Sequence, residues 1–455
     1  MKKKIGFIVF LGVFLLMSLW PLVGMAIAGP SEAAVKETLA KPPSLTGADG
    51  SFNFRVLNDT VDYFADHFAS RQELITLNAK LEATVFGESA EDDVILGRDG
   101  WLFYKSTLDD YQGQNPLTER EIWSAARCLA LIQEYAEVRN VSFLFVVAPN
   151  KNTLYPQYMP ARYLRSEEAG NAERLSDALR EAGVKTADLE AALRAEDGVL
   201  YHRLDSHWNN LGAAVAHDKI LDALGKDSSH LYQTERYTAA QDHEADLYQM
   251  LYPAGGEKDV QYYPAQGWSF TYDRPIRSAE DQLINTSCAG QSGSLLMFRD
   301  SFGNTLHTFM AESFGTASFS RAMPYDLSLL EEEGADTLVI EIVERNIGWL
   351  VQRAPILPAP IRQIDVPETC DDAIGFTLTY SQKSEGAYCC TGNLSCAPDT
   401  DSPIWLVCDG TVYEASPAGS GEQPFTAYLP DQPATIQIMF LRNGTPVISQ
   451  AVPAK

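Results

Sequence analysis

The pattern of apolar and polar positions separates the chain into segments of different kinds. Residues 5–28 form an apolar run without charge, directly after the basic start Met1-Lys2-Lys3-Lys4. At about 1.5 Å per residue, a helix of this length could cross a hydrocarbon core roughly 30 Å thick. Lysines at the start of such a helix remain on the cytoplasmic side. The pattern therefore predicts a membrane anchor over residues 1–28, with the rest of the chain outside the cytoplasm.

A cleaved signal peptide is the alternative interpretation of the same segment. Ala26-Ile27-Ala28 before Gly29 fits the small-x-small pattern of a cleavage site. The apolar run is longer than a usual signal core, which favours the uncleaved anchor. Cleavage after Ala28 would instead produce a secreted protein, so both interpretations place the folded part outside the cytoplasm.

Helical and strand-like patterns alternate through the middle of the chain. Residues 29–50, rich in Ala, Pro, Ser and Gly, are typical of a linker. Apolar residues three or four positions apart then predict helices over residues 52–86, from Thr118 onward, and over 169–182, 209–224 and 302–312. Short apolar runs predict strands over residues 141–149, 185–189, 294–298 and 337–343, and a hairpin over 92–104. This alternation predicts an α/β domain with a mainly parallel sheet over residues 51–353.

The last quarter of the chain has an all-β pattern. Four prolines in residues 354–367 indicate a domain junction. Beyond it, short strands between turns are predicted over residues 375–380, 404–408, 425–429, 436–441 and 447–452. Such a series is typical of a small β-sandwich, here expected over residues 368–455.

Cysteine usage and net charge narrow the class of protein. Five of the seven cysteines lie between Cys370 and Cys408. Outside the cytoplasm such a cluster predicts disulfides of undetermined pairing, with reduced thiols as the alternative. The formal charge of −26 argues against nucleic acid as a partner. The sequence shows no metal-binding or nucleotide-binding motif, and we expect neither a metal nor a cofactor.

Asp205, His207 and Ser301 are the residue types of a nucleophilic acyl-transfer site. A serine hydroxyl needs a nearby base, an imidazole can accept and return its proton, and a carboxylate fixes the imidazole tautomer. Ser301 ends an apolar run and precedes a predicted helix, whose free N–H groups favour a developing oxyanion. The alternatives are that Ser301 only caps the helix and that His307 is the base.

Further candidates follow strands of the predicted sheet. Ligand crevices in such sheets lie outside the carboxyl ends of the strands. Asn150, Lys151, Arg299 and Asn304 are therefore candidate oxyanion or substrate contacts, with loop capping as the alternative. The aromatic-rich residues 232–272 are predicted to be an insertion that either stacks on sugar rings or forms a packing cluster.

Five segments carry a resemblance to a known family. They are DHFASRQELITLNAKLEATVFG, DDVILGRDGWLFY, APNKNTLYPQYMP, YHRLDSHWNNLGA and LLMFRDSFGNTL. In content and order they resemble the DHHW family of SGNH-hydrolase-like proteins, related to the periplasmic proteins that O-acetylate alginate. The resemblance covers most of residues 55–350. The Asp-His-His-Trp motif that names the family appears here with Ser206 in its second position.

The resemblance implies an SGNH-hydrolase-like fold and O-acetyl transfer to an extracellular polysaccharide. Acetyl would pass to Ser301 and then to a sugar hydroxyl, with His207 as base and acid and Asp205 as its partner. It also implies a membrane-bound O-acyltransferase as the partner that exports acetyl groups. Two other functions remain open: an esterase of the same fold, with water as acceptor, and a non-catalytic protein that binds or assembles glycans.

Overall fold

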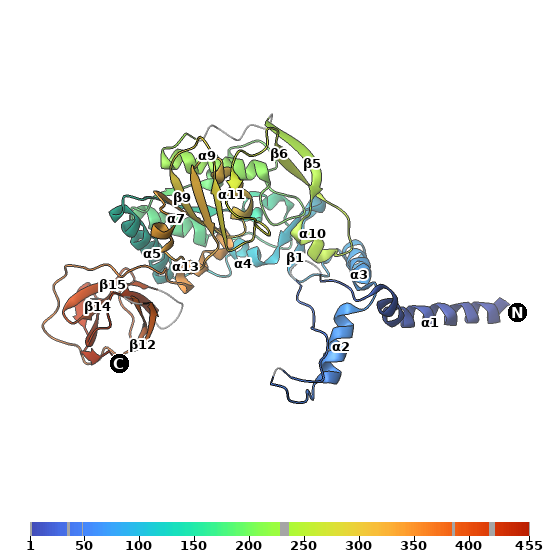
Figure 1. Ribbon diagram of the computed structural model, residues 1–455, viewed down its shortest axis with the longest axis horizontal. Helices are drawn as coiled ribbons and strands as arrows, with labels where there is room; N and C mark the ends of the chain where they lie inside the picture. Colours follow the sequence, from blue (N-terminus) through green and yellow to red (C-terminus); the bar gives the residue numbers. More distant parts are fainter. Residues whose placement is uncertain are drawn as a thin grey trace.

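The computed structural model describes residues 2–33, 37–47, 49–227, 236–384, 387–417 and 424–454. The predicted anchor, linker, aromatic insertion and C-terminal domain each include a few residues outside these ranges. Figure 1 shows an α/β body at the centre, a β domain on one side of it and helix α1 projecting on the other.

The N-terminal part of the chain is helical. In α1 (Lys2–Ala28), residues Ile5–Ala28 are long and apolar enough to cross a membrane, and most of this stretch is exposed. The helix predicted over residues 52–86 is instead two helices, α2 (Val56–His67) and α3 (Arg71–Val85). The break falls at Ser70, whose φ of 61° is left-handed and interrupts the helical hydrogen bonds.

The central sheet has seven strands in the order β4-β3-β11-β9-β10-β8-β7. The first five strands are parallel, whereas β8 and β7 are added antiparallel at one edge. This arrangement confirms a mainly parallel sheet. The strands are β3 (Ser142–Ala148), β4 (Thr186–Ala187), β7 (Thr271–Tyr272), β8 (Leu283–Ser287), β9 (Ser294–Phe298), β10 (Thr316–Ser320) and β11 (Thr337–Val343).

Helices cover both faces of this sheet. Along β3, Phe143 and Phe145 pack in one core with α5 (Glu119–Val138), α7 (Asn171–Glu181) and α13 (Gly348–Gln352). Leu144 and Val146 pack in a second core with α8 (Leu189–Arg194), α9 (Asn210–Leu224) and α11 (Gly303–Ala311). Successive strand residues point to opposite faces, so an unbroken apolar strand serves both cores.

Shorter elements surround this body. The predicted hairpin forms from β1 (Val94–Leu96) and β2 (Leu102–Tyr104), with positive φ at Asp99 and Gly100 in its turn. A second hairpin pairs β5 with β6. The remaining elements are α4 (Leu108–Gln112), α6 (Lys151–Leu154), β5 (Tyr237–His243), α10 (Asp246–Leu251), β6 (Asp259–Pro264) and α12 (Leu329–Glu332).

The C-terminal domain is an antiparallel sheet whose strands curl around their own core (Figure 1). Its strands are β12 (Phe376–Ser384), β13 (Ala387–Leu394), β14 (Ile404–Cys408), β15 (Thr411–Pro417), β16 (Pro424–Leu429), β17 (Thr435–Arg442), β18 (Thr445–Ile448) and β19 (Val452–Pro453). The all-β class is confirmed, but the sheet is continuous rather than a sandwich of two sheets. The reason lies in β15, which pairs with β14 over most of its length and with β16 at Ser416 and Pro417.

The expected disulfides are not formed. All seven cysteines lie within the described ranges, and all are free thiols. Cys389 and Cys390 are neighbours on β13, so their side chains point to opposite faces of the sheet. Cys370 and Cys396 instead accept hydrogen bonds from Gln437 and Arg442.

Candidate active site

The loop over residues 201–210, between α8 and α9, is held in place by its own hydrogen bonds. Tyr201 and Trp208 form an isolated β-bridge, and the indole Nε1 of Trp208 donates to the carbonyl oxygen of Phe302 at 3.1 Å. Asn209 caps α9, because its Oδ1 accepts from the N–H groups of Leu211 and Gly212. The loop is therefore closed on itself and joined to the turn that carries Ser301.

Ser301 lies in the turn between β9 and α11. The preceding Asp300 organises this turn, since its carboxylate accepts from the backbone N–H groups of Phe302 and Val343 at 3.0 and 2.8 Å. It also accepts from Nδ2 of Asn346 at 3.0 Å. With Asp300 holding the backbone, the Ser301 side chain is available to face the cavity.

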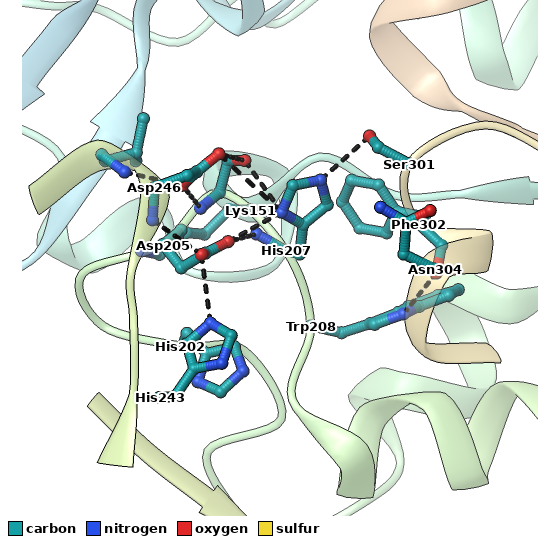
Figure 2. Close-up of polar contacts among 12 residues, drawn as sticks. Lys151, His202, Asp205, His207, Trp208, His243, Asp246, Ser301, Phe302 and Asn304 are labelled. Atoms are coloured by element: carbon teal, nitrogen blue, oxygen red, sulfur yellow. Dashed lines mark hydrogen bonds and ion pairs between the residues drawn. The ribbon is translucent and has the colours of Figure 1, made fainter. Parts of the chain in front are cut away.

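Ser301, His207 and Asp205 form a continuous hydrogen-bonded relay (Figure 2). Ser301 Oγ lies 2.9 Å from His207 Nε2, and His207 Nδ1 lies 2.7 Å from Asp205 Oδ1. Burial alone would raise the pKa of Asp205, but His207 and hydrogen bonds from His207 and His243 lower that pKa well below its usual range. Asp205 is therefore ionised at neutral pH and can stabilise a protonated His207.

The relay opens into a cavity of about 1320 Å³. Its walls come from the loops that follow β9 and β11, from residues 321–326 and from the 201–210 loop. Arg345, in the turn after β11, and Trp349, in α13, line the cavity. This position matches the expectation that the crevice lies at the carboxyl ends of the parallel strands. A cavity of this size can hold a sugar residue together with an ester group.

Lys151 and Asn150 lie behind the site. Lys151 is 3% exposed, and its Nζ donates to the carbonyl oxygens of Leu102, Arg203 and Asp205 at 2.7, 2.8 and 2.9 Å. Burial lowers the pKa of Lys151 to about 7. Asn150 donates through its backbone N–H to Glu344. Neither residue is among the described residues that line the cavity: Lys151 supports the 201–210 loop, and Asn150 contacts the turn after β11.

Arg299 and Asn304 do line the cavity. Arg299 Nη1 donates to Oδ1 of Asn304 at 2.6 Å, and Arg299 Nη2 donates to the Ala279 carbonyl at 2.7 Å. The Nδ2 group of Asn304 donates to Glu280 at 3.3 Å. This longer bond leaves the Asn304 amide as the more available donor of the two for a ligand.

The rival base His307 lies elsewhere. Its Nδ1 donates to the carbonyl oxygen of Asn304 at 2.7 Å, and its Nε2 accepts from the Tyr272 hydroxyl at 3.1 Å. Burial lowers the pKa of His307 to about 4. Both ring nitrogens are thus engaged away from Ser301.

Described aromatic residues of the insertion lie away from the cavity: several are packed, whereas Tyr263 and Tyr272 are exposed. Trp268 packs edge-on against Phe309, and Tyr248 is buried in a small core beside α10. None of the insertion's described aromatic residues is among those that line the cavity. The aromatic residues that do line it are Tyr104, Trp208, Tyr325 and Trp349.

Sequence reasoning missed three residues beside Asp205. These are His202, His243 and Asp246, all of which line the cavity. Asp246 donates its backbone N–H to Asp205 Oδ2 at 2.9 Å, and its side chain accepts from Ser206 Oγ at 2.8 Å. No local motif marks His243 or Asp246, because they belong to an insertion about 40 residues further along the chain.

One group of side chains in the described part of the chain has ligand atoms close enough to hold a metal ion. Asp205, His207 and Asp246 place these atoms within 4.8 Å of one another. Hydrogen bonds already engage them: His207 Nδ1 with Asp205, and Asp246 Oδ2 with Ser206. The atoms of Asp205 and His207 thus serve the relay to Ser301, and Asp246 is engaged with Ser206 beside it.

Comparison with known proteins places this geometry in context. Residues 94–290 match the family model described as SGNH hydrolase-like domain, acetyltransferase AlgX. This range includes Asp205 and His207, whereas Ser301 lies just beyond it. The chain is 25% identical over 223 residues to the probable alginate O-acetylase AlgJ of Pseudomonas syringae pv. tomato, covering 48% of this chain and 51% of that protein. It is 24% identical over 152 residues to the probable alginate O-acetylase AlgJ of Pseudomonas putida, covering 33% and 38%. The chain thus spans about half or less of the length of these curated relatives.

Comparison with solved structures finds similarity at low identity, including to three proteins. The O-acetyltransferase domain of Pseudomonas putida AlgJ is 17% identical, with a TM-score of 0.38 over 56% of this chain and 92% of that one. Bacillus cereus PatB1 is 19% identical, with a TM-score of 0.42 over 55% and 95%. A DHHW family protein from Eubacterium siraeum is 18% identical, with a TM-score of 0.39 over 49% and 85%. The family match and the curated relatives confirm the resemblance seen in the sequence: residues 94–290 are similar to the SGNH hydrolase-like domain of the AlgX family model, and the chain is similar to AlgJ.

Proposed function

We propose that the protein is an extracytoplasmic O-acetyltransferase that modifies a polysaccharide through an acetyl-serine intermediate on Ser301. One observation carries this proposal: Ser301, His207 and Asp205 are linked at 2.9 and 2.7 Å within a large open cavity. The match of residues 94–290 to an acetyltransferase family supports acetyl as the transferred group.

The first half-reaction would acetylate the enzyme. His207 Nε2 takes the proton of Ser301 as Oγ attacks the carbonyl carbon of the acetyl donor. The developing oxyanion would be stabilised by backbone N–H groups at the start of α11 and by the Asn304 amide. The intermediate then collapses: the donor's oxygen leaves with the proton from His207, and acetyl remains on Ser301.

The second half-reaction would reverse these roles. A sugar hydroxyl attacks the acetyl-serine carbonyl while His207 accepts the hydroxyl proton. Collapse returns that proton to Ser301 Oγ and leaves an O-acetylated sugar. Asp205 stabilises the imidazolium in both steps, which its low pKa permits.

Membrane attachment would bring the enzyme to its donor. The apolar helix α1 supports anchoring through residues 5–28, with cleavage after Ala28 as the alternative. A membrane-bound O-acyltransferase is the proposed partner, because acetyl groups must reach an enzyme outside the cytoplasm. Retention of the full chain in membranes after alkaline carbonate extraction would support the anchor, and release into the supernatant would contradict it.

Substitution of Ser301 tests the function. We expect Ser301→Ala to lose acetyl transfer from 4-nitrophenyl acetate to an oligosaccharide by at least roughly 10³-fold, with comparable losses in His207→Ala and Asp205→Ala. Ser176→Ala, on the exposed face of α7, is the matched control and should keep full activity. Full activity in folded Ser301→Ala would refute the proposal.

The products separate the remaining functions. Acetylated sugar in the presence of an oligosaccharide acceptor indicates a transferase. Acetate release alone indicates an esterase that uses water as acceptor. Glycan binding without labelling of Ser301 by a fluorophosphonate probe indicates a non-catalytic binding protein.

A further inference from the structure

The Asp205 carboxylate is held from two sides. Oδ1 accepts from Nδ1 and the backbone N–H of His207 at 2.7 and 2.9 Å. Oδ2 accepts from Nε2 of His243 at 3.1 Å and from the backbone N–H of Asp246 at 2.9 Å. Each oxygen thus receives one imidazole and one backbone N–H. Figure 2 shows His207 and His243 on different sides of Asp205, with only His207 reaching Ser301.

The β5–β6 hairpin delivers His243 to this position. His243 is the last residue of β5 and pairs with Asp259 of β6 after an irregularity in the register. The hairpin is in turn attached to the loop over residues 201–210: Asp259 accepts from the backbone N–H of Leu204, and Gln261 accepts from that of Asn210. The hairpin and the loop therefore form one connected unit.

Stacking restrains the His243 ring further. His202 and His243 lie parallel, with ring centroids 3.8 Å apart and an interplanar angle of 1°. His202 is 1% exposed, and burial lowers its pKa to about 3. The His243 ring therefore stacks on an uncharged imidazole. A ring stacked on one side and hydrogen-bonded at its edge has little freedom to turn away from Asp205.

The charges that face His243 come from several elements. Acidic groups are Asp205 in the loop, Asp246 at the start of α10, Asp259 on β6 and the neighbouring Glu244. Basic groups around the same carboxylate are His207 and the buried Lys151, whereas the stacked His202 is neutral. Burial of His243 disfavours its charged form, but the hydrogen bond to Asp205 and the acidic charges outweigh it and raise the pKa of His243.

We propose that His243 is a positioning residue of the site. It holds the Asp205 carboxylate against His207 and offsets part of the negative charge that Asp205 presents to His207. The proposal rests on the function proposed for Ser301 and adds a residue that does not touch the reacting atoms. A carboxylate with both oxygens held cannot rotate, so His207 Nε2 stays directed at Ser301. A positive charge on His243 also offsets part of the negative charge of Asp205, so the pH dependence of the rate should change when that charge is removed.

Two substitutions separate these effects. His243→Ala removes both the N–H donor and the charge. His243→Gln removes the charge but keeps an N–H donor that can reach Asp205 Oδ2. His67→Gln is the matched control, because His67 lies in α2, where Nδ1 bonds the Tyr63 carbonyl and its ring stacks on Tyr63. Thermal unfolding of each variant measures stability independently of activity.

The expected results are specific. His243→Ala should lower kcat roughly 10- to 100-fold with little change in KM, because the relay loses its alignment. His243→Gln should recover most of kcat, while the acid limb of its pH–rate profile moves roughly half a unit to one unit toward higher pH. His67→Gln should match the parent chain. Parental kcat and pH profile in His243→Ala, or equal losses in His243→Ala and His243→Gln with no shift of the acid limb, would overturn the proposal.

The rate at which a sulfonyl fluoride labels Ser301 distinguishes this inference from the proposed function. Labelling reports the relay without any donor or acceptor. The parent chain and the His243 variants could differ in labelling rate as expected while the parent chain transfers no acetyl group. That result would refute the acetyltransferase and retain the inference. Acetyl transfer with parental labelling rates in both His243 variants would refute the inference and retain the enzyme.

Discussion

At the scale of single residues, the turn before Ser301 depends on a buried carboxyl. Glu341 on β11 is 1% exposed, and its Oε2 accepts from the Asp300 backbone N–H at 3.2 Å. Burial, with the adjacent charge of Asp300, raises the pKa of Glu341 well above its usual value of 4.5. Glu341 is therefore a neutral acid at pH 7, and it supports the turn without adding a second negative charge beside Asp300.

This protonation state predicts a pH-dependent effect of Glu341→Gln on stability. Below pH 4.5 the wild-type side chain is protonated in both the folded and the unfolded states. As pH rises, the unfolded chain loses this proton while the folded chain keeps it. The stability of the wild type relative to Glu341→Gln should therefore fall with rising pH, by at most about 1.4 kcal/mol per pH unit. Urea unfolding at several pH values between 4 and 8 measures this difference; a difference that does not change with pH would contradict the assignment.

At the scale of elements, α9 packs closely against the loop that carries Asp205 and His207. A Cβ on Gly212 would collide with the Leu200 carbonyl oxygen and lie 2.9 Å from Cβ of Trp208. The neighbours Ala213, Ala214 and Ala216 are fully buried as well. The small side chains on this helix let the loop approach its backbone, and that approach sets the position of Trp208 beside Phe302.

Gly212→Ala should therefore disturb both folding and activity. Overpacking of this kind costs about 1–3 kcal/mol. Because α9 and the loop would have to separate, we expect acetyl transfer to fall as well. Gly170→Ala is the matched control, since a Cβ there meets nothing within 4 Å and its φ of −73° suits alanine. Equal stability of the two variants in thermal unfolding would show that the contact at Gly212 is not tight.

At the scale of the whole molecule, a charged cluster joins the C-terminal domain to α5. Glu414 of β15 is 2% exposed and accepts from Arg127 at 2.6 and 2.7 Å and from Arg362 at 2.6 Å. Arg362 also bonds Glu134 of α5. Arg362 belongs to residues 354–367, which we propose as the junction between the domains over 51–353 and 368–455. The cluster thus fixes junction and domain to the α/β body.

Glu414→Ala should loosen this attachment. Arg127 and Arg362 are 28% and 21% exposed, so the loss of Glu414 should cost less than the about 3–5 kcal/mol that breaking a fully buried pair costs. We expect calorimetry to resolve separate transitions for the two domains and limited proteolysis to cleave within residues 354–367. Glu331→Ala, which breaks an exposed pair with Arg139, is the control and should change little. A single unchanged transition in Glu414→Ala would show that the domains are held together by other contacts.

Local signals in the sequence predicted much of this architecture. The helix that starts at Thr118, the hairpin over residues 92–104 and the apolar run of β3 depend on neighbouring residues, and all three are present. The break at Ser70 and the continuous C-terminal sheet were not predicted, and free cysteines were only the alternative to the disulfides that we expected. Each of these depends on packing between distant segments, which periodicity and composition do not describe.

The sequence by itself determined which chemistry the chain could carry: an acid and an imidazole two residues apart, and a serine between a buried strand and a helix. Only the tertiary structure decided that these groups meet, because 94 residues separate His207 from Ser301 and the parallel sheet joins them. It also brought His243 to the far side of Asp205. That contact arises from a hairpin folding back over the loop, and no spacing along the chain encodes it.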